Sequence, residues 1–143
     1  MFQRILVPVD STPASELVIP YAIDLAKALD AEVVLCNVVT APSGTNASNA
    51  RKLAAQYVSD ISRRFRDEGI AVKTQVRGGE PATAIRKTAV EWEVDAIVMA
   101  TRSRRRFEKL MLGSVADAVV RDSHLPVLLV SSRDARARKR SAA

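Results

Sequence analysis

The stretch RILVPVDSTPASELVIPYAIDLAKALDAEVVLCNVV, residues 4–39, places a longer periodic segment between two short apolar runs. The runs at 4–10 and 31–39 are rich in Val, Ile and Leu and are bounded by polar residues, which predicts two buried strands. The segment between them, 11–30, repeats apolar residues in a way that predicts a helix. A strand, a helix and a second strand in this order are typical of a parallel sheet.

The first predicted helix carries recognisable signals at its start. Thr12 suits the capping position and Pro13 suits the first helical position. Pro20 is expected to kink or interrupt the early part of this helix, because proline lacks the N–H that the helix requires. The expected apolar face consists of Leu17, Tyr21, Ile23, Leu25 and Leu29.

The same alternation continues along the rest of the chain. Further helices are expected at 49–69, at 81–94 and from Gly113 or Ser114 to Arg121, and further strands at 70–79, 95–100 and 126–130. The helix at 49–69 has an apolar face in which Leu53, Tyr57, Ile61 and Phe65 recur at a spacing of four, and Gly69 suits its end. The pattern predicts an α/β fold, a doubly wound, five-stranded parallel sheet with helices on both faces.

Length and composition favour one globular domain. The chain has 143 residues, of which 48% are hydrophobic and 27% are charged. It contains no apolar run of about 18 residues, so we expect no membrane span. Its first residues lack a signal-peptide pattern, and the single cysteine, Cys36, lies in an apolar run that predicts a buried, inert thiol. These features favour a cytoplasmic protein.

The positive charge is concentrated at the C-terminus. Of the net charge of +6, the segment 133–143 carries +4, which leaves about +2 for the remainder. This segment has no apolar periodicity, so we expect a domain over 1–132 and a disordered basic tail over 133–143. Aromatic residues make up only 4% of the chain, which disfavours a nucleic-acid binder.

A dense basic segment follows the strand predicted at 95–100. In MATRSRRRFEKLMLGSVADAVV, residues 99–120, four arginines precede Gly113 and Ser114, which begin an apolar-periodic helix. Such a segment beside a helix start favours an anion site, because a helix N-terminus attracts negative charge. A solvated surface loop is the alternative. The four arginines are Arg102, Arg104, Arg105 and Arg106.

The chain resembles the universal stress protein family over residues 2–131, in ILVPVDSTPAS, in VRGGEPATAI and above all in DAIVMATRSRRRFEKLMLGSVADAVVRDSHLPVLLV. Nucleotide-binding members of that family carry Gly, two residues, Gly, nine residues and then Gly-Ser or Gly-Thr. Here Ala100, Ser103, Gly113 and Ser114 occupy those positions, so the spacing and the Gly-Ser end are intact and both leading glycines are replaced. The resemblance implies the strand order 3-2-1-4-5.

The two replacements weaken the family motif without erasing it. Ala100 adds one methyl group at a strand end, and Ser103 adds a short side chain that disfavours positive φ. Ser103 keeps its backbone N–H and adds a hydroxyl donor, so the backbone cradle for a phosphate is expected to survive.

The resemblance also implies which residues form the site. Asp10 resembles the residue near the ribose or a phosphate-bound metal, although a helix-capping role is the alternative. Pro8 and Val9 would line the adenine cleft. Val38 resembles the position whose backbone meets the adenine edge, and a plain core-strand role is equally compatible with it.

The remaining implied residues surround the sugar and the phosphates. Those expected to pass under the ribose and phosphates are Met99, Ala100, Thr101, Arg102 and Ser103. Those expected to offer backbone N–H groups from a helix N-terminus are Gly113, Ser114, Val115 and Ala116.

By this resemblance the chain is expected to be a regulatory module of the stress response that binds ATP, or else AMP, with Mg possible through the phosphates. We do not expect an enzyme, because no general base is evident and the GxxxxGK[ST] pattern is absent. The alternative is a nucleotide-free dimeric interaction protein in which the replaced glycines have abolished binding. The last strand, 126–130, would end the sheet, and we expect a homodimer through it.

Overall fold

The computed structural model of the chain describes residues 1–40, 45–101, 104–106, 109–111 and 113–131. A five-stranded parallel sheet runs in the order β3-β2-β1-β4-β7, so the predicted order 3-2-1-4-5 is confirmed. Its strands are β1 (Arg4–Pro8), β2 (Glu32–Val39), β3 (Val72–Gly78), β4 (Ala96–Thr101) and β7 (Val127–Ser131). The helices are α1 (Pro13–Leu29), α2 (Thr45–Asp67), α3 (Pro81–Glu91) and α4 (Ser114–Asp122).

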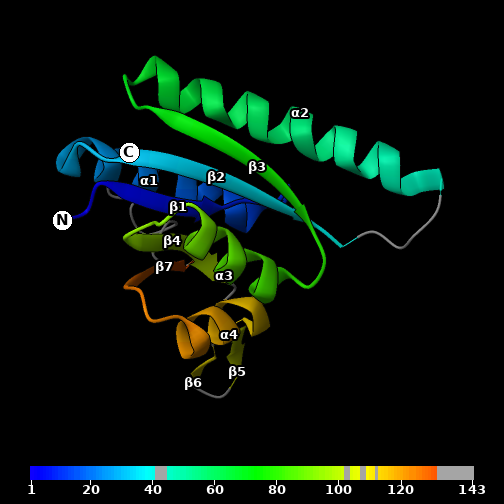
Figure 1. Cartoon of the computed structure of the whole chain (residues 1–143). Coiled ribbons are helices and arrows are strands. Elements are labelled where there is room, and N and C mark those ends of the chain that lie inside the picture. Colours follow the sequence, from blue (N-terminus) through cyan, green and yellow to red (C-terminus); the bar gives the residue numbers. More distant parts are fainter. Residues whose placement is uncertain (41–44, 102–103, 107–108, 112, 132–143) are drawn as a thin grey trace.

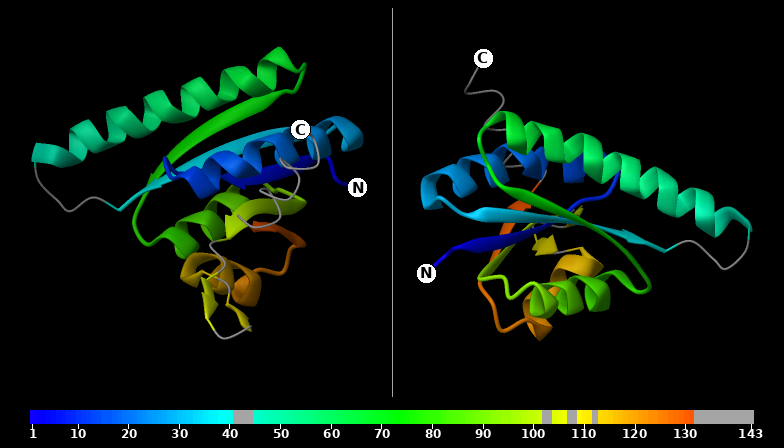
Figure 2. Two further views of the ribbon diagram at one scale, coloured as in Figure 1. Left: turned by 180° about the vertical axis from the view of Figure 1, so that it is seen from behind. Right: turned by 45° about the horizontal axis from the view of Figure 1, so that its top comes forward.

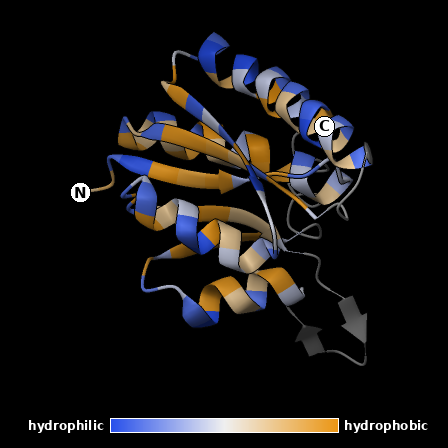
Figure 3. Ribbon diagram, turned by 45° about the vertical axis from the view of Figure 1, so that its right-hand side comes forward, coloured by the Kyte–Doolittle hydropathy of each residue, from blue (hydrophilic) through white to orange (hydrophobic). Residues whose placement is uncertain are grey.

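Two helices cover each face of the sheet, α1 and α2 on one side and α3 and α4 on the other (Figures 1 and 2). Because side chains alternate along a strand, β1 contributes to both cores: Ile5 and Val7 pack with α1 and α2, and Leu6 packs with α3 and α4. The central strands are therefore apolar along most of their length (Figure 3).

No helix among the described residues is both long and apolar enough to cross a membrane.

The buried face of α1 differs from the predicted one. The helix turns a set of small and β-branched residues toward the sheet. These buried residues are Ser15, Val18, Ile19, Ala22 and Ala26. Of the predicted face, Leu29 is 38% exposed, whereas the other four members are partly buried and pack at the margin of the core beneath α1: Leu17, Tyr21, Ile23 and Leu25. Pro20 does not interrupt α1, which is continuous, and it lies on the exposed side of the helix; the expected kink there stays a prediction.

The helix α2 begins at Thr45, four residues before the predicted start. The apolar residues that were predicted to form its buried face, spaced four apart, do not stay on one side of the helix. A step of four residues overshoots one helical turn by about 40°, so three such steps drift by about 120°. Leu53 is accordingly 73% exposed, whereas Phe65 is fully buried. Residues at true helical spacing form the buried face: Ala54, Val58, Ile61, Ser62 and Phe65.

The helix ends follow the capping signals of the sequence. The Thr12 hydroxyl accepts a hydrogen bond from the Ser15 N–H at 3.4 Å, and Pro13 is the first helical residue of α1. Gly69 follows α2 with a φ of +78°, a conformation that favours glycine.

The basic segment between β4 and α4 contains more regular structure than the predicted loop. Its backbone forms an antiparallel pair of short strands, β5 (Arg104–Arg106) and β6 (Lys109–Met111). The sequence patterns predicted neither of these two short strands. Arg102, Ser103 and the predicted tail 133–143 lie outside the described residues, so the division of the chain at 132 stays a prediction.

The start of α3 gives a test of stability against pH. Glu80 accepts hydrogen bonds from the Thr83 hydroxyl at 2.6 Å, the Thr83 N–H at 2.8 Å and the Ala82 N–H at 3.1 Å. These bonds, led by the Thr83 hydroxyl, hold the pKa of Glu80 below its ordinary value of 4.5. A carboxylate whose pKa is lowered by folding stabilises the fold above its unfolded pKa, and this contribution is lost as the pH falls through the folded pKa.

We therefore expect Glu80→Gln to melt at a lower temperature than the parent at pH 7. The difference should persist down to about pH 4.5 and shrink at lower pH, where the parent carboxylate is protonated too. Thermal melts of both proteins between pH 7 and pH 3 measure it. A difference that stays constant across this range would show that the charge of Glu80 contributes nothing.

Candidate functional site

The sheet has a notch at its carboxyl edge, above the end of β1. The last pair of β1 with β2 is Pro8 with Cys36, whereas β2 continues three residues further to Val39. On the other side β4 extends to Thr101, which pairs with Ser131 of β7. The strand order reverses between β1 and β4, and in open parallel sheets such a point is where ligands bind.

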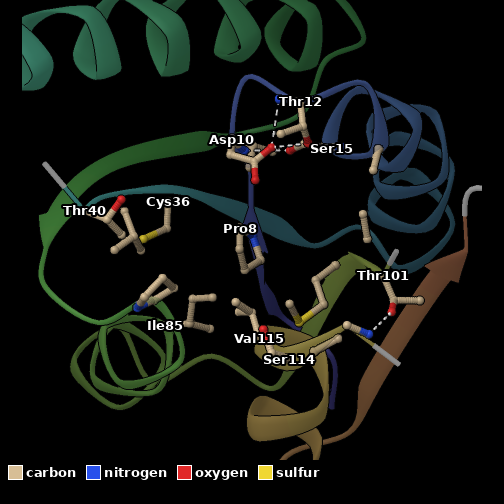
Figure 4. A pocket seen from close by; sticks show the side chains of 18 residues that line it. Pro8, Asp10, Thr12, Ser15, Cys36, Thr40, Ile85, Thr101, Ser114 and Val115 are labelled. Atoms are coloured by element: carbon tan, nitrogen blue, oxygen red, sulfur yellow. Dashed lines mark hydrogen bonds between the residues drawn. The ribbon is translucent and has the colours of Figure 1, made fainter. Parts of the chain in front are cut away.

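A cavity of about 410 Å³ occupies this notch, and Figure 4 shows the side chains around it. The predicted site residues that line it are Pro8, Val9, Asp10, Val38, Met99, Ala100, Thr101, Gly113, Ser114, Val115 and Ala116. The structure thus brings together segments from β1, β2, β4 and α4. The other two predicted site residues, Arg102 and Ser103, lie outside the described residues. For every predicted site residue, contact with a ligand stays a prediction.

The sequence analysis missed several residues that line the same cavity. They are Thr12, Ala14, Ser15, Cys36, Thr40, Pro81 and Ile85. Except for Ile85, which lies in the second turn of α3, their signal was positional: they lie on β2, at its end, or at the start of a helix that follows a strand. All such points meet at the carboxyl edge of a parallel sheet. Cys36 is buried as predicted, and burial raises the pKa of its thiol, which keeps it protonated.

The turn after β1 holds Asp10 through several hydrogen bonds. Asp10 Oδ1 accepts from the Thr12 N–H at 2.9 Å and from the Thr12 hydroxyl, and the Asp10 N–H donates to Ser15 Oγ at 2.7 Å. Thr12, and not Asp10, caps α1. Within the described part of the chain no hydrogen bond engages Asp10 Oδ2, so this oxygen remains available at the cavity.

The start of α4 forms the opposite wall of the cavity. Gly113 is its N-cap and has extended backbone angles, with φ −60° and ψ 155°, and no side chain caps the helix there. The Gly113 N–H donates to Thr101 Oγ1 at 3.2 Å, so the buried Thr101 ties the end of β4 to the start of α4 (Figure 4). Thr101 was predicted to lie beneath the sugar of a nucleotide. The structure adds a second role, the hydrogen bond to the Gly113 N–H, which the sequence did not predict.

The three helix starts at the cavity differ in how they are capped. The Thr12 hydroxyl caps α1 and the Glu80 carboxylate caps α3, whereas α4 has no side-chain cap. The first N–H groups of a helix have no intrahelical acceptor, and the helix dipole favours an anion beside them. Among these three helices, α4 is therefore the one whose N-terminus can receive an anion.

The floor and the remaining wall of the cavity are apolar. Val9, Met99 and Ile85 are each at most 5% exposed, and Val38 is partly buried where β2 outruns β1. The arrangement therefore offers an anion-binding end at α4, a free carboxylate oxygen at Asp10 and an apolar surface suited to a flat, weakly polar group.

Comparison with known proteins identifies relatives of the chain. A universal stress protein of Methanocaldococcus jannaschii is 29% identical over 140 residues, covering 91% of this chain and 82% of the relative. A universal stress protein of Methanothermobacter thermautotrophicus is 30% identical over 144 residues, covering 91% and 96%.

Solved structures share the fold. A universal stress protein of Archaeoglobus fulgidus has a TM-score of 0.76 and 26% identity over 90% of this chain and 98% of its own. A universal stress protein solved in complex with cAMP has a TM-score of 0.72 and 22% identity, covering 91% and 97%. A universal stress protein of Archaeoglobus fulgidus in complex with dAMP has a TM-score of 0.67 and 24% identity, covering 90% and 98%.

The family comparison spans all of the described residues. The profile of the universal stress protein family matches residues 1–131, from the first residue to the end of β7. With the parallel sheet order and the relatives above, this match shows that the chain belongs to the universal stress protein family.

Proposed function

We propose that this chain is a cytoplasmic regulatory module of the stress response that binds an adenine nucleotide, ATP or else AMP, in the cavity above β1. The observation that carries the proposal is the cavity itself, about 410 Å³ between the uncapped N-terminus of α4 and the Asp10 turn. Small-molecule sites are typically concave, mostly apolar and furnished with a few polar groups, as this one is.

The phosphates would lie at the start of α4. The N–H groups of Ser114, Val115 and Ala116 begin this helix, and its dipole favours negative charge there. The Ser114 hydroxyl is exposed and adds a donor. The Glu80 carboxylate that caps α3 would repel a phosphate at the start of α3. The start of α4 is therefore the favoured position for the anion.

The base and the sugar would occupy the other end of the cavity. Val38 and Ile85 provide apolar surface for the base, and Asp10 Oδ2 can accept hydrogen bonds from ribose hydroxyls. The complexes of two universal stress proteins with cAMP and dAMP support the choice of an adenine ligand.

A magnesium ion would enter with the phosphates. In the alternative role of Asp10, its Oδ2 would bind this ion instead of the ribose hydroxyls, since Mg²⁺ prefers carboxylate oxygens. The described residues contain no group of three or more His, Cys, Asp and Glu side chains arranged to hold a metal. Apart from water molecules, most ligands of the magnesium ion would therefore be phosphate oxygens of the nucleotide.

The chemistry of the cavity supports binding more than catalysis. Among the described residues that line it, Asp10 is the sole ionisable group besides the buried Cys36 thiol. One Asp10 oxygen already accepts from Thr12, and hydrolysis of ATP would require a base aimed at an attacking water.

Two measurements test the nucleotide proposal. The protein is purified without added nucleotide and denatured, and the released small molecules are separated and identified; we expect ATP or AMP. Calorimetric titration with ATP and magnesium should then show saturable binding after the nucleotide has been removed. No released nucleotide together with no heat at millimolar ATP would favour the nucleotide-free dimeric protein instead.

We also propose a homodimer through β7. This strand pairs with β4 on one side and ends the sheet on the other, and Leu128 is 48% exposed there. An exposed apolar edge strand favours pairing with another chain, and antiparallel pairing of residues 126–130 with their symmetry mates gives a two-fold interface.

Leu128→Lys is expected to convert this dimer to a monomer, because two lysines would face each other across the paired edges. Sedimentation velocity at micromolar concentration measures the change. Leu53→Lys, which charges an exposed leucine on α2, is the matched control and should remain dimeric. A monomeric parent protein at this concentration would contradict the dimer.

A further inference from the structure

One residue outside the cavity contacts the turn that presents Asp10. Tyr57 lies on α2 and is not among the cavity residues, yet its hydroxyl donates a hydrogen bond to the Asp10 carbonyl oxygen at 2.5 Å. The tyrosine ring is half-buried against the core that α1 and α2 form with the sheet. The contact joins residues 47 positions apart in the sequence.

The bond completes the restraint of Asp10. Its N–H donates to Ser15, its Oδ1 accepts from Thr12, and its carbonyl accepts from Tyr57. Among the described residues, Oδ2 is the hydrogen-bonding atom of Asp10 that these contacts leave available. A carboxylate held in this way is oriented before a ligand arrives, which lowers the entropy lost on binding.

The surroundings keep the Tyr57 hydroxyl protonated and oriented. Glu16 Oε1 is a second acceptor for the Tyr57 hydroxyl, at 3.3 Å, and the much shorter contact with the Asp10 carbonyl is the one that the single hydroxyl proton favours. Glu16 Oε2 accepts a hydrogen bond from Arg64 at 2.9 Å. Burial, together with the negative charge of Glu16, raises the pKa of Tyr57 to about 12. The hydroxyl therefore remains a donor throughout the physiological pH range.

We propose that Tyr57 is a positioning residue for nucleotide binding: by holding the Asp10 carbonyl, it aims Asp10 Oδ2 at the ribose hydroxyls. The proposal rests on the proposed function, because it requires a nucleotide in the cavity. No described residue of α2 lines the cavity. Through Tyr57, this helix would nevertheless contribute to the affinity of the site for a nucleotide.

The test compares ATP with 2′,3′-dideoxy-ATP, which lacks both ribose hydroxyls. Tyr57→Phe keeps the ring and its packing and removes only the hydroxyl. We expect it to weaken ATP binding by about five- to tenfold, the effect of one hydrogen bond, and to leave the affinity for dideoxy-ATP unchanged. Titration calorimetry of parent and variant with both nucleotides measures this.

Two further variants separate positioning from a general structural role. Arg63→Gln removes an exposed ion pair with Asp60 on the same helix and leaves the contacts of Tyr57 unchanged, so it should bind both nucleotides as the parent does. Asp10→Asn should weaken ATP binding by itself, and adding Tyr57→Phe to it should have little further effect, because both substitutions act on one contact.

Each contrary outcome has a distinct meaning. If Tyr57→Phe binds ATP as the parent does, or weakens both nucleotides equally, Tyr57 does not act through Asp10 on the ribose and the inference is overturned. A parent that binds both nucleotides equally well overturns it too. A parent that binds neither overturns the proposed function, and with it this inference.

Discussion

Gly113→Val is expected to abolish nucleotide binding at concentrations where the parent saturates. Gly113 lines the cavity and is the N-cap of α4, immediately before the N–H groups at which we place the phosphates. A branched side chain at this position would occupy the space through which a phosphate approaches the backbone. We expect the dissociation constant to rise by about a hundredfold or more, equivalent to about 3 kcal/mol.

The fold should tolerate this substitution. The φ of −60° and ψ of 155° at Gly113 are extended backbone angles that valine adopts readily, and the Gly113 N–H bond to Thr101 does not depend on the side chain. The melting temperature of Gly113→Val should therefore stay close to that of the parent. Loss of binding can then be attributed to the site.

Calorimetry with ATP and magnesium measures the effect. Gly113→Ala, which adds a single methyl group, is the graded control and should weaken binding much less than valine does. If Gly113→Val binds ATP as the parent does, the ligand lies away from the start of α4, and the phosphate placement is wrong even though the chain binds nucleotide.

Phe65→Ala is expected to cause the largest loss of stability. Among the described residues, Phe65 is the largest fully buried side chain, and it packs with α1 and the sheet near the C-terminal end of α2. Truncation of a buried phenylalanine removes its apolar contacts and leaves a cavity, at a cost of about 3–5 kcal/mol. For a chain of this length the melting temperature should fall by roughly 10 °C or more.

Leu53→Ala is the matched control for Phe65→Ala. Both residues belong to the predicted apolar face of α2, but Leu53 is 73% exposed and its truncation should change the stability by less than about 0.5 kcal/mol. Thermal and urea unfolding of both variants measure the contrast. Equal losses for the two variants would contradict the rotation of the buried face, and would place Leu53 in contact with another part of the protein.

The comparison of these two residues shows where sequence patterns lose accuracy. The apolar character of Leu53 and Phe65 correctly predicted a helix, since periodicity is a property of neighbouring residues. Which residues that helix buries depends on the sheet beneath it and on its exact rotation, as the small residues Ala22 and Ala26 on α1 also show. Side-chain size alone favoured Leu17 and Leu25, which are only partly buried.

The candidate site was predictable to a similar extent. Asp10, Gly113 and the other predicted residues that the structure describes line one cavity, because parallel strands bring their carboxyl ends to one edge. Ile85 could not be assigned from its own surroundings, since it lies inside a helix whose packing brings it to the cavity wall. The side chain of Tyr57 was correctly expected to pack, but its hydrogen bond to Asp10 had no signal in the sequence.

By itself the sequence determined the alternation of strands and helices, the capped start of α1 and the parallel sheet, because each depends on residues a few positions apart. The tertiary structure alone decided the depth of the notch above Pro8, which follows from how far β2 and β4 extend beyond β1. It also decided the contact of Tyr57 with Asp10 and of Thr101 with Gly113. Such features depend on strand register and helix packing, which bring distant residues together and which no local pattern encodes.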